Sequence, residues 1–223
     1  RQSNKPSIAI IGPLNDISNH IDDINKYDQI IFINPSNKYK FDNHNLSDIA
    51  YYYRTPSIDA IQNNLFEPPE EKPLFVVCEK TTDQKISPNY LAKRNIIKED
   101  HSKLINNSNL IGKLNAIQSI SLHLIQMGYR NIAIYGGDLF LTPRTINKRK
   151  DYAPYQKKIF KGIEPKSEYN IFVCHEPYIN FIILKILFEK NLIKPYETLE
   201  RILNLSYEEY ISELSQIIYN ERK

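Results

Sequence analysis

Short apolar runs recur along the chain, and helix-like patterns stand between several of them. The runs are SIAIIG (7–12), DQIIFIN (28–34), IAYYY (49–53), PLFVVCE (73–79), NIAIYGGD (131–138) and NIFVC (170–174). Such runs, bounded by Gly, Pro, Asn and Asp, are typical of strands buried on both faces. Strands that alternate with helices favour a mostly parallel sheet with helices on its faces. We therefore expect an α/β fold, with a single Rossmann-like domain that spans residues 1–223.

The helix patterns are read from apolar residues at spacings of three and four. NDISNHIDDIN (15–25) offers Asn15 or Asp16 as an N-cap ahead of Ile17, Ile21 and Ile24. LNAIQSISLHLIQMG (114–128) ends in Gly128, which suits a helix C-terminus. The residues that share its apolar face are Ile117, Ile120, Leu124 and Met127. We expect a C-terminal helical segment as well, with helices in 178–191 and 206–222 and a short one in 192–205.

The bulk composition narrows the classes of function. The chain has 29 basic and 26 acidic residues and a net charge of +3, which by itself does not indicate a nucleic-acid partner. Cys78 and Cys174 have neither zinc-site spacing nor a disulfide pattern, which favours a reducing compartment. No apolar stretch is long enough to span a bilayer and no signal peptide is visible. The sequence begins with Arg1, so we expect it to be a piece of a longer protein.

Basic residues are concentrated in TPRTINKRKDYAPYQKKIFKG (142–162). A run of charge is commonly a solvated surface loop. The alternative is an anion-binding lid, at about 141–169, in which the hydroxyls of Tyr152 and Tyr155 and the charge of Lys150 neutralise a departing phosphate. Packing of the tyrosines against the loop explains their presence equally well.

In open parallel sheets, ligands bind beyond the carboxyl ends of the strands. Residues at four expected strand ends should therefore converge: 12–16, 34–37, 136–138 and 174–176. The first turn lacks both the dinucleotide glycine pattern and a phosphate loop, so it is either purely structural or presents backbone N–H groups to an anion. The expected ligand-binding residues here are Gly12, Pro13, Leu14 and Asn15.

The other strand ends carry their own candidates. Asn34 either closes a turn or reads a base or ribose edge. Gly136 and Gly137 allow close backbone approach, and Asp138 follows them. A lone Asp is weak evidence for a metal ion, and the chain has no Asp-x-Asp pair, so we expect no bound metal.

Histidine is the natural proton acceptor at neutral pH. His20, His44 and His101 lie in polar surroundings and are expected at the surface, and His123 lies off the apolar stripe of its helix. His175 alone falls at an expected strand end, where it either caps the next helix or acts as a base.

The order of these segments resembles that of the bacterial lipooligosaccharide sialyltransferases, which transfer sialic acid from CMP-sialic acid to a glycan. MGYRNIAIYGGDLF (127–140) is similar to their Gly-Tyr turn, strand and Gly-x-Asp-aromatic ending, and YDQIIFIN (27–34) is similar to the strand that ends in a nucleotide-binding Asn. DYAPYQKKIFKGI (151–163) resembles the loop that binds the CMP phosphate, and CHEPYINFIILKIL (174–187) resembles the segment with the catalytic histidine. The first turn departs from the family's Gly-Asn-Gly-Pro-Ser, Glu176 replaces a common Ser, and 35–110 matches nothing.

The resemblance implies an inverting, metal-independent transfer with no cofactor, in which the CMP-sugar is a substrate. His175 is then the general base, Tyr152, Tyr155 and Lys150 stabilise the leaving group, and Asn15 and Asn34 hold the nucleotide. The expected partners are a CMP-activated sugar and a bacterial surface glycan, without nucleic acid; an oligomer is compatible with the sequence. The expected location is the cytoplasm, where the basic loop could touch the inner membrane.

Other interpretations stay open. One is a transferase of Kdo or another CMP-ulosonic acid, as a domain of a larger capsule or lipopolysaccharide enzyme. Another is a non-catalytic module that binds nucleotides or glycans. A methyl- or phosphotransferase is disfavoured, because the first loop is not glycine-rich and acidic metal ligands are missing.

Overall fold

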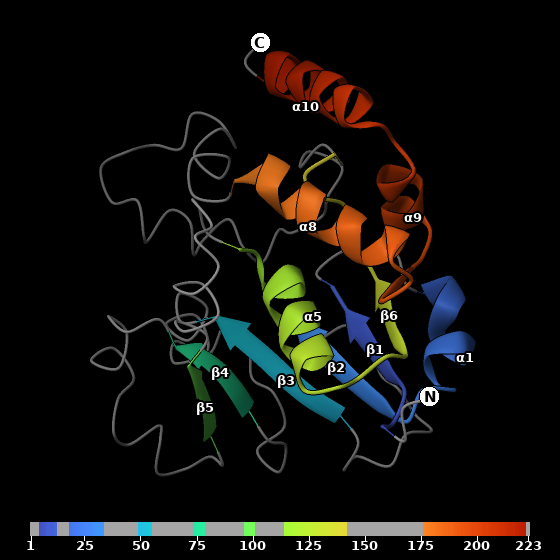
Figure 1. Cartoon of the computed structure of the whole chain (residues 1–223), viewed down its shortest axis with the longest axis vertical. Coiled ribbons are helices and arrows are strands. Elements are labelled where there is room, and N and C mark those ends of the chain that lie inside the picture. The colour runs from blue at the N-terminus through green and yellow to red at the C-terminus, as the bar shows by residue number, and fades with distance from the viewer. Residues whose placement is uncertain are drawn as a thin grey trace.

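The computed structural model describes residues 5–12, 18–33, 49–54, 74–78, 96–100, 114–141 and 176–221. These residues form a seven-stranded sheet with the order β5-β4-β3-β2-β1-β6-β7, and each neighbouring pair is parallel. The predicted α/β class, with a parallel sheet and flanking helices, is therefore confirmed (Figure 1). The expected strand at 170–174 and the expected lid from 142 to 169 lie outside the described residues.

The strands follow the apolar runs closely. β1 (Ile8–Ile11), β2 (Gln29–Ile33), β3 (Ile49–Arg54), β4 (Leu74–Cys78) and β6 (Ile132–Tyr135) lie within or beside the predicted ranges. The sequence did not indicate β5 (Ile96–Asp100) or β7 (Lys194–Pro195). β5 is mostly polar, and β7 has two residues, so neither has the continuous apolar pattern of the central strands. Proline is tolerated in β7 because it is an edge strand.

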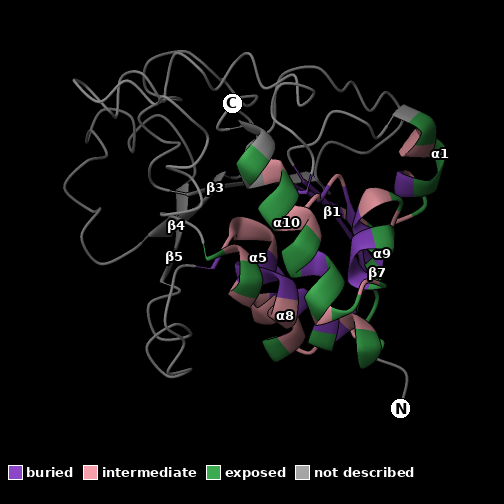
Figure 2. Ribbon diagram, turned by 90° about the horizontal axis from the view of Figure 1, so that it is seen from above, coloured by how far each residue is buried: buried purple, intermediate pink, exposed green. Residues whose placement is uncertain are grey.

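One face of the central strands packs against four helices. These are α5 (Ala116–Gln126), α8 (Pro177–Glu189), α9 (Thr198–Leu203) and α10 (Tyr207–Glu221), which gather on one side of β1 in Figure 2. Ile10, Ile31 and Ile134 lie in register on this face and belong to its apolar core. The short helix predicted within 192–205 is confirmed as α9.

The opposite face of the same strands packs against α1 (Ile21–Ile24), which follows a 3-10 turn at Ser18–His20. Ala9, Ile30 and Ala133 lie in register here and form a second core with Ile24 of α1. Alternate residues of a strand point to opposite faces. The two cores therefore explain why β1, β2 and β6 are apolar at almost every position.

The predicted C-terminus of α5 is confirmed at Gly128. The φ angle of Gly128 is 94°, and its N–H donates to the carbonyl of Ile125 while the N–H of Tyr129 donates to that of Leu124. This bond pair is the Schellman motif. The prediction that Met127 faces the core was wrong: Met127 is the C-cap and is 49% exposed, because the helix stops one residue before it.

Candidate ligand site at the carboxyl ends of β1 and β6

β1 is the point at which the sheet changes its direction of growth. The chain passes from β1 to β2 on one side, continues outward to β5, and then returns to form β6 on the other side of β1. α1, which follows β1, and α5, which precedes β6, pack on opposite faces of the sheet. In parallel α/β sheets, such a switch point leaves a crevice in which ligands bind.

The structure brings Gly12 and Gly136 together at this switch point. The N–H of Gly12 donates to the carbonyl of Tyr135 at 2.7 Å. A Cβ atom on Gly12 would lie 2.5 Å from the carbonyl oxygen of Gly136 and 3.1 Å from the Cδ1 atom of Ile117 on α5. Glycine is thus required at position 12, because a side chain would collide with the backbone of the neighbouring strand end.

The loop after β6 has an unusual backbone. Gly136 has a φ of 67°, and two non-glycine residues, Leu139 and Phe140, have φ values of 44° and 68°. Non-glycine residues in this region cost about 1–3 kcal/mol each and persist only where the surroundings hold them. Such strain is concentrated at ligand sites, which makes this loop a candidate for one.

Asp138 supports the loop from within. Its Oδ1 accepts a hydrogen bond from the N–H of Phe140 at 3.2 Å, and its carbonyl accepts one from the N–H of Leu141 at 2.9 Å. The side chains of Leu139 and Leu141 are buried in the helical core. The carboxylate and the carbonyl of Asp138 therefore both stabilise the turn.

α8 begins beside this loop. Glu176 is the N-cap and Pro177 the first helical residue, a position at which proline is well tolerated. The exposed side chain of Glu176 makes no cap bond. Its carbonyl accepts hydrogen bonds from the backbone N–H of Asn180 at 3.1 Å and from Nδ2 of Asn180 at 2.8 Å.

Asn180 also connects the starts of α8 and α5. It is fully buried, and its Oδ1 accepts a hydrogen bond from the N–H of Asn115 at 2.7 Å. Nε2 of Gln118, which is buried as well, donates to the carbonyl of Asn180 at 3.3 Å. Buried polar groups usually form hydrogen bonds within the protein. These two hydrogen bonds hold the starts of α5 and α8 together.

The structure thus describes part of the predicted site. Gly12 and Gly136 lie in close approach, and Gly137 and Asp138 follow in the same loop. An added Cβ on Gly137 would lie 3.3 Å from the Cδ2 atom of Leu199, so α9 packs closely behind it. The other predicted residues lie outside the described ranges; they are Pro13, Leu14, Asn15, Asn34, Lys150, Tyr152, Tyr155 and His175.

Sequence reasoning missed a polar aromatic cluster on the α1 face. His20 was expected at the surface, but its side chain is only 18% exposed and its Nε2 pairs with the carboxylate of Glu197. Its ring lies 5.6 Å from that of Tyr135, and Tyr135 stacks on Tyr196 at 4.2 Å. No sequence pattern links residues so far apart. The pairing of β6 with β7 brings Tyr135 and Tyr196 together, and the turn before α1 places His20 beside them.

Burial raises the pKa values of two tyrosines in this cluster, Tyr27 and Tyr135. Burial raises the pKa of Tyr27 to about 12, with the hydroxyl of Tyr196, 3.3 Å away, adding to the effect. Burial likewise raises the pKa of Tyr135. Both hydroxyls are therefore neutral at physiological pH.

Within the described part of the chain, no group of three or more His, Cys, Asp or Glu residues is placed to hold a metal ion. The helices of that part include none with the length and apolar character needed to cross a membrane. No family model matches the sequence, and no curated protein matches it either.

Proposed function

We propose that this protein is an inverting, metal-independent glycosyltransferase that moves sialic acid, or a related ulosonic acid, from a CMP-sugar to a bacterial surface glycan. The observation that carries the proposal is the close approach of Gly12 to Gly136 at the switch point of a parallel sheet. The loop at 136–141, in which Leu139 and Phe140 are strained, belongs in part to the segment that most resembles the sialyltransferases. We also propose that the sheet is Rossmann-like and that the basic segment at about 141–169 forms an anion-binding lid.

The switch point suits a nucleotide for a physical reason. Gly12 and Gly136 allow the carboxyl ends of β1 and β6 to pack closely, and glycine is the residue that permits such close approach of backbone. The central strand order, in which β1 stands between β2 and β6, is the order seen where doubly wound sheets bind nucleotides. Asn34 directly follows β2 in sequence, Asn15 comes four residues after the end of β1, and both are assigned to the nucleotide.

The proposed reaction is a single displacement. The hydroxyl oxygen of the acceptor forms a bond to the anomeric carbon, and the bond from that carbon to the CMP phosphate breaks. His175 takes the hydroxyl proton, and CMP leaves with the bonding electrons. Tyr152, Tyr155 and Lys150 stabilise the negative charge of the phosphate.

The test is release of CMP from CMP-Neu5Ac and, separately, from CMP-Kdo, in the presence of glycan acceptors. We expect release with one of these donors, undiminished by EDTA. His175→Ala should lower the rate by about 10²-fold because the proton acceptor is lost. His123→Ala, at a histidine on α5, is the matched control and should retain activity.

The outcomes separate the alternatives. Strong inhibition by EDTA would contradict the metal-free mechanism, and full activity of His175→Ala would remove that residue as the base. CMP binding without cleavage of either donor would identify a nucleotide-binding module instead of a transferase.

A further inference from the structure

Tyr210 of α10 is the residue that connects the strained loop with the start of α8. Its side chain is fully buried, and its ring stacks on Phe181 of α8 with centroids 4.0 Å apart and planes 2° from parallel. Stacking fixes the ring, so the position of the hydroxyl is fixed as well.

The hydroxyl lies between two backbone carbonyls. Its oxygen is 2.8 Å from the carbonyl oxygen of Leu139 and 3.3 Å from that of Pro177. A tyrosine hydroxyl has one proton to donate. Both carbonyls therefore share that proton, and the shorter bond is to Leu139.

The bond to Leu139 reaches the residue whose backbone is strained. Leu139 has a φ of 44° and is itself buried. A buried carbonyl without a donor is costly, so the hydroxyl favours the conformation that presents this carbonyl to it. Burial, together with the charge of Asp138, raises the pKa of Tyr210, so the hydroxyl keeps its proton at physiological pH.

We propose that Tyr210 is a positioning residue that holds the 136–141 loop and the start of α8 in one fixed arrangement. This inference rests on the proposed function, in which the loop contacts the donor. His175, which directly precedes Glu176, is the base in that proposal. Tyr210 lies 71 residues after Leu139 of the loop and acts through the backbone carbonyls of the two segments. Its role is to keep the two segments in register during transfer.

The direct test is hydrogen exchange in the Tyr210→Phe variant. Phenylalanine preserves the stacked ring and removes only the hydroxyl. The amides to follow are those of Phe140 and Leu141 in the loop and of Asn180 in α8, each of which donates a hydrogen bond. We expect all three to exchange about three- to tenfold faster, the factor that corresponds to loss of one hydrogen bond.

Tyr207→Phe is the matched control. Tyr207 lies one turn earlier on α10 and contacts Phe181 edge-on, at 5.8 Å and 85°. This variant should leave the three amides unchanged. Unchanged exchange in Tyr210→Phe, faster exchange in the loop alone, an equal effect of Tyr207→Phe, or uniform acceleration that includes the amides of β1 would overturn the inference.

Steady-state kinetics tests the functional consequence. For Tyr210→Phe we expect kcat to fall about tenfold while the KM for the CMP-sugar stays within about twofold, because orientation and not binding is impaired. Unchanged kcat alongside faster exchange would contradict the positioning role. An inactive wild-type protein would overturn the proposed function, while the exchange experiment would still decide whether Tyr210 couples the two segments.

Discussion

At the scale of single residues, Gly12 has the least freedom to change. A Cβ at this position meets a backbone carbonyl at 2.5 Å, and backbone cannot rotate away as a side chain can. The clash involves the two strand ends that form the switch point. A change at Gly12 should therefore affect both the stability of the sheet and the ligand that we place there.

We expect Gly12→Ala to destabilise the protein by about 1–3 kcal/mol, the usual cost of overpacking a buried site. We also expect it to lower the affinity for CMP about tenfold, because the carbonyl of Gly136 must move. Chemical denaturation measures the first effect and calorimetry the second.

Gly128→Ala is the control. Gly128 also has a positive φ, but an added Cβ meets no atom within 4 Å. Its cost of about 1–2 kcal/mol comes from the backbone conformation alone. CMP affinity should not change. A Gly12→Ala protein that binds CMP as tightly as the wild type would remove the switch point as the site.

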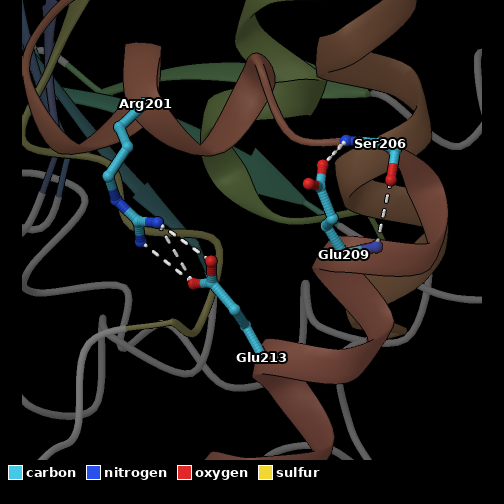
Figure 3. A network of polar contacts seen from close by, with 4 residues as sticks. All are labelled: Arg201, Ser206, Glu209 and Glu213. Atoms are coloured by element: carbon cyan, nitrogen blue, oxygen red, sulfur yellow. Dashed lines mark hydrogen bonds and ion pairs between the residues drawn. The ribbon is translucent and has the colours of Figure 1, made fainter.

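At the scale of elements, α10 has a well-formed N-terminus. The side-chain oxygen of Ser206 accepts a hydrogen bond from the N–H of Glu209 at 3.1 Å, and the carboxylate of Glu209 accepts one from the N–H of Ser206 at 2.7 Å (Figure 3). This reciprocal pair is a capping box. The same view shows Arg201 of α9 paired with Glu213, an exposed contact worth about 0–1 kcal/mol.

Ser206→Ala should lower the free energy of unfolding by about 1 kcal/mol, because the N–H of Glu209 loses its partner. Ser212→Ala makes the same replacement at an exposed position inside α10 and should be neutral or slightly stabilising, since alanine favours helix. Denaturant unfolding of both variants measures the difference. Equal effects of the two replacements would contradict the capping role.

The sequence was sufficient for elements with a continuous local pattern. Ile8–Ile11 and Ile132–Tyr135 are apolar because both of their faces are covered, and Gly128 ends α5 through local backbone geometry. β5 and β7 were missed because edge strands need neither length nor apolar character. Their pairing depends on neighbours that are distant in sequence.

Part of the candidate site could likewise be predicted from the sequence, and part could not. The glycines at 12 and 136 were predicted because strand ends in parallel sheets converge and glycine permits close approach. The contacts of Tyr210 and His20 were not predicted, since Leu139 lies 71 residues from Tyr210 and Glu197 lies more than 170 residues from His20. Long-range contacts of this kind leave no periodic signal in one sequence.

At the scale of the whole molecule, the two cores meet at the central strands. α5, α8, α9 and α10 cover one face and α1 the other, so every residue of β1 and β6 is buried. The loop after β6 is strained and is hydrogen-bonded to Tyr210, and Asn180 joins the starts of α5 and α8. A loop that is held in one conformation by its surroundings is what a precise binding site requires.

A crystal structure of the protein with CMP tests this account most directly. We predict that the nucleotide lies at the carboxyl ends of β1 and β6, in contact with the backbone of Gly12 and of residues 136–138. CMP bound on another surface, or no CMP bound at saturating concentration, would contradict the assignment of the switch point and of the function proposed for it.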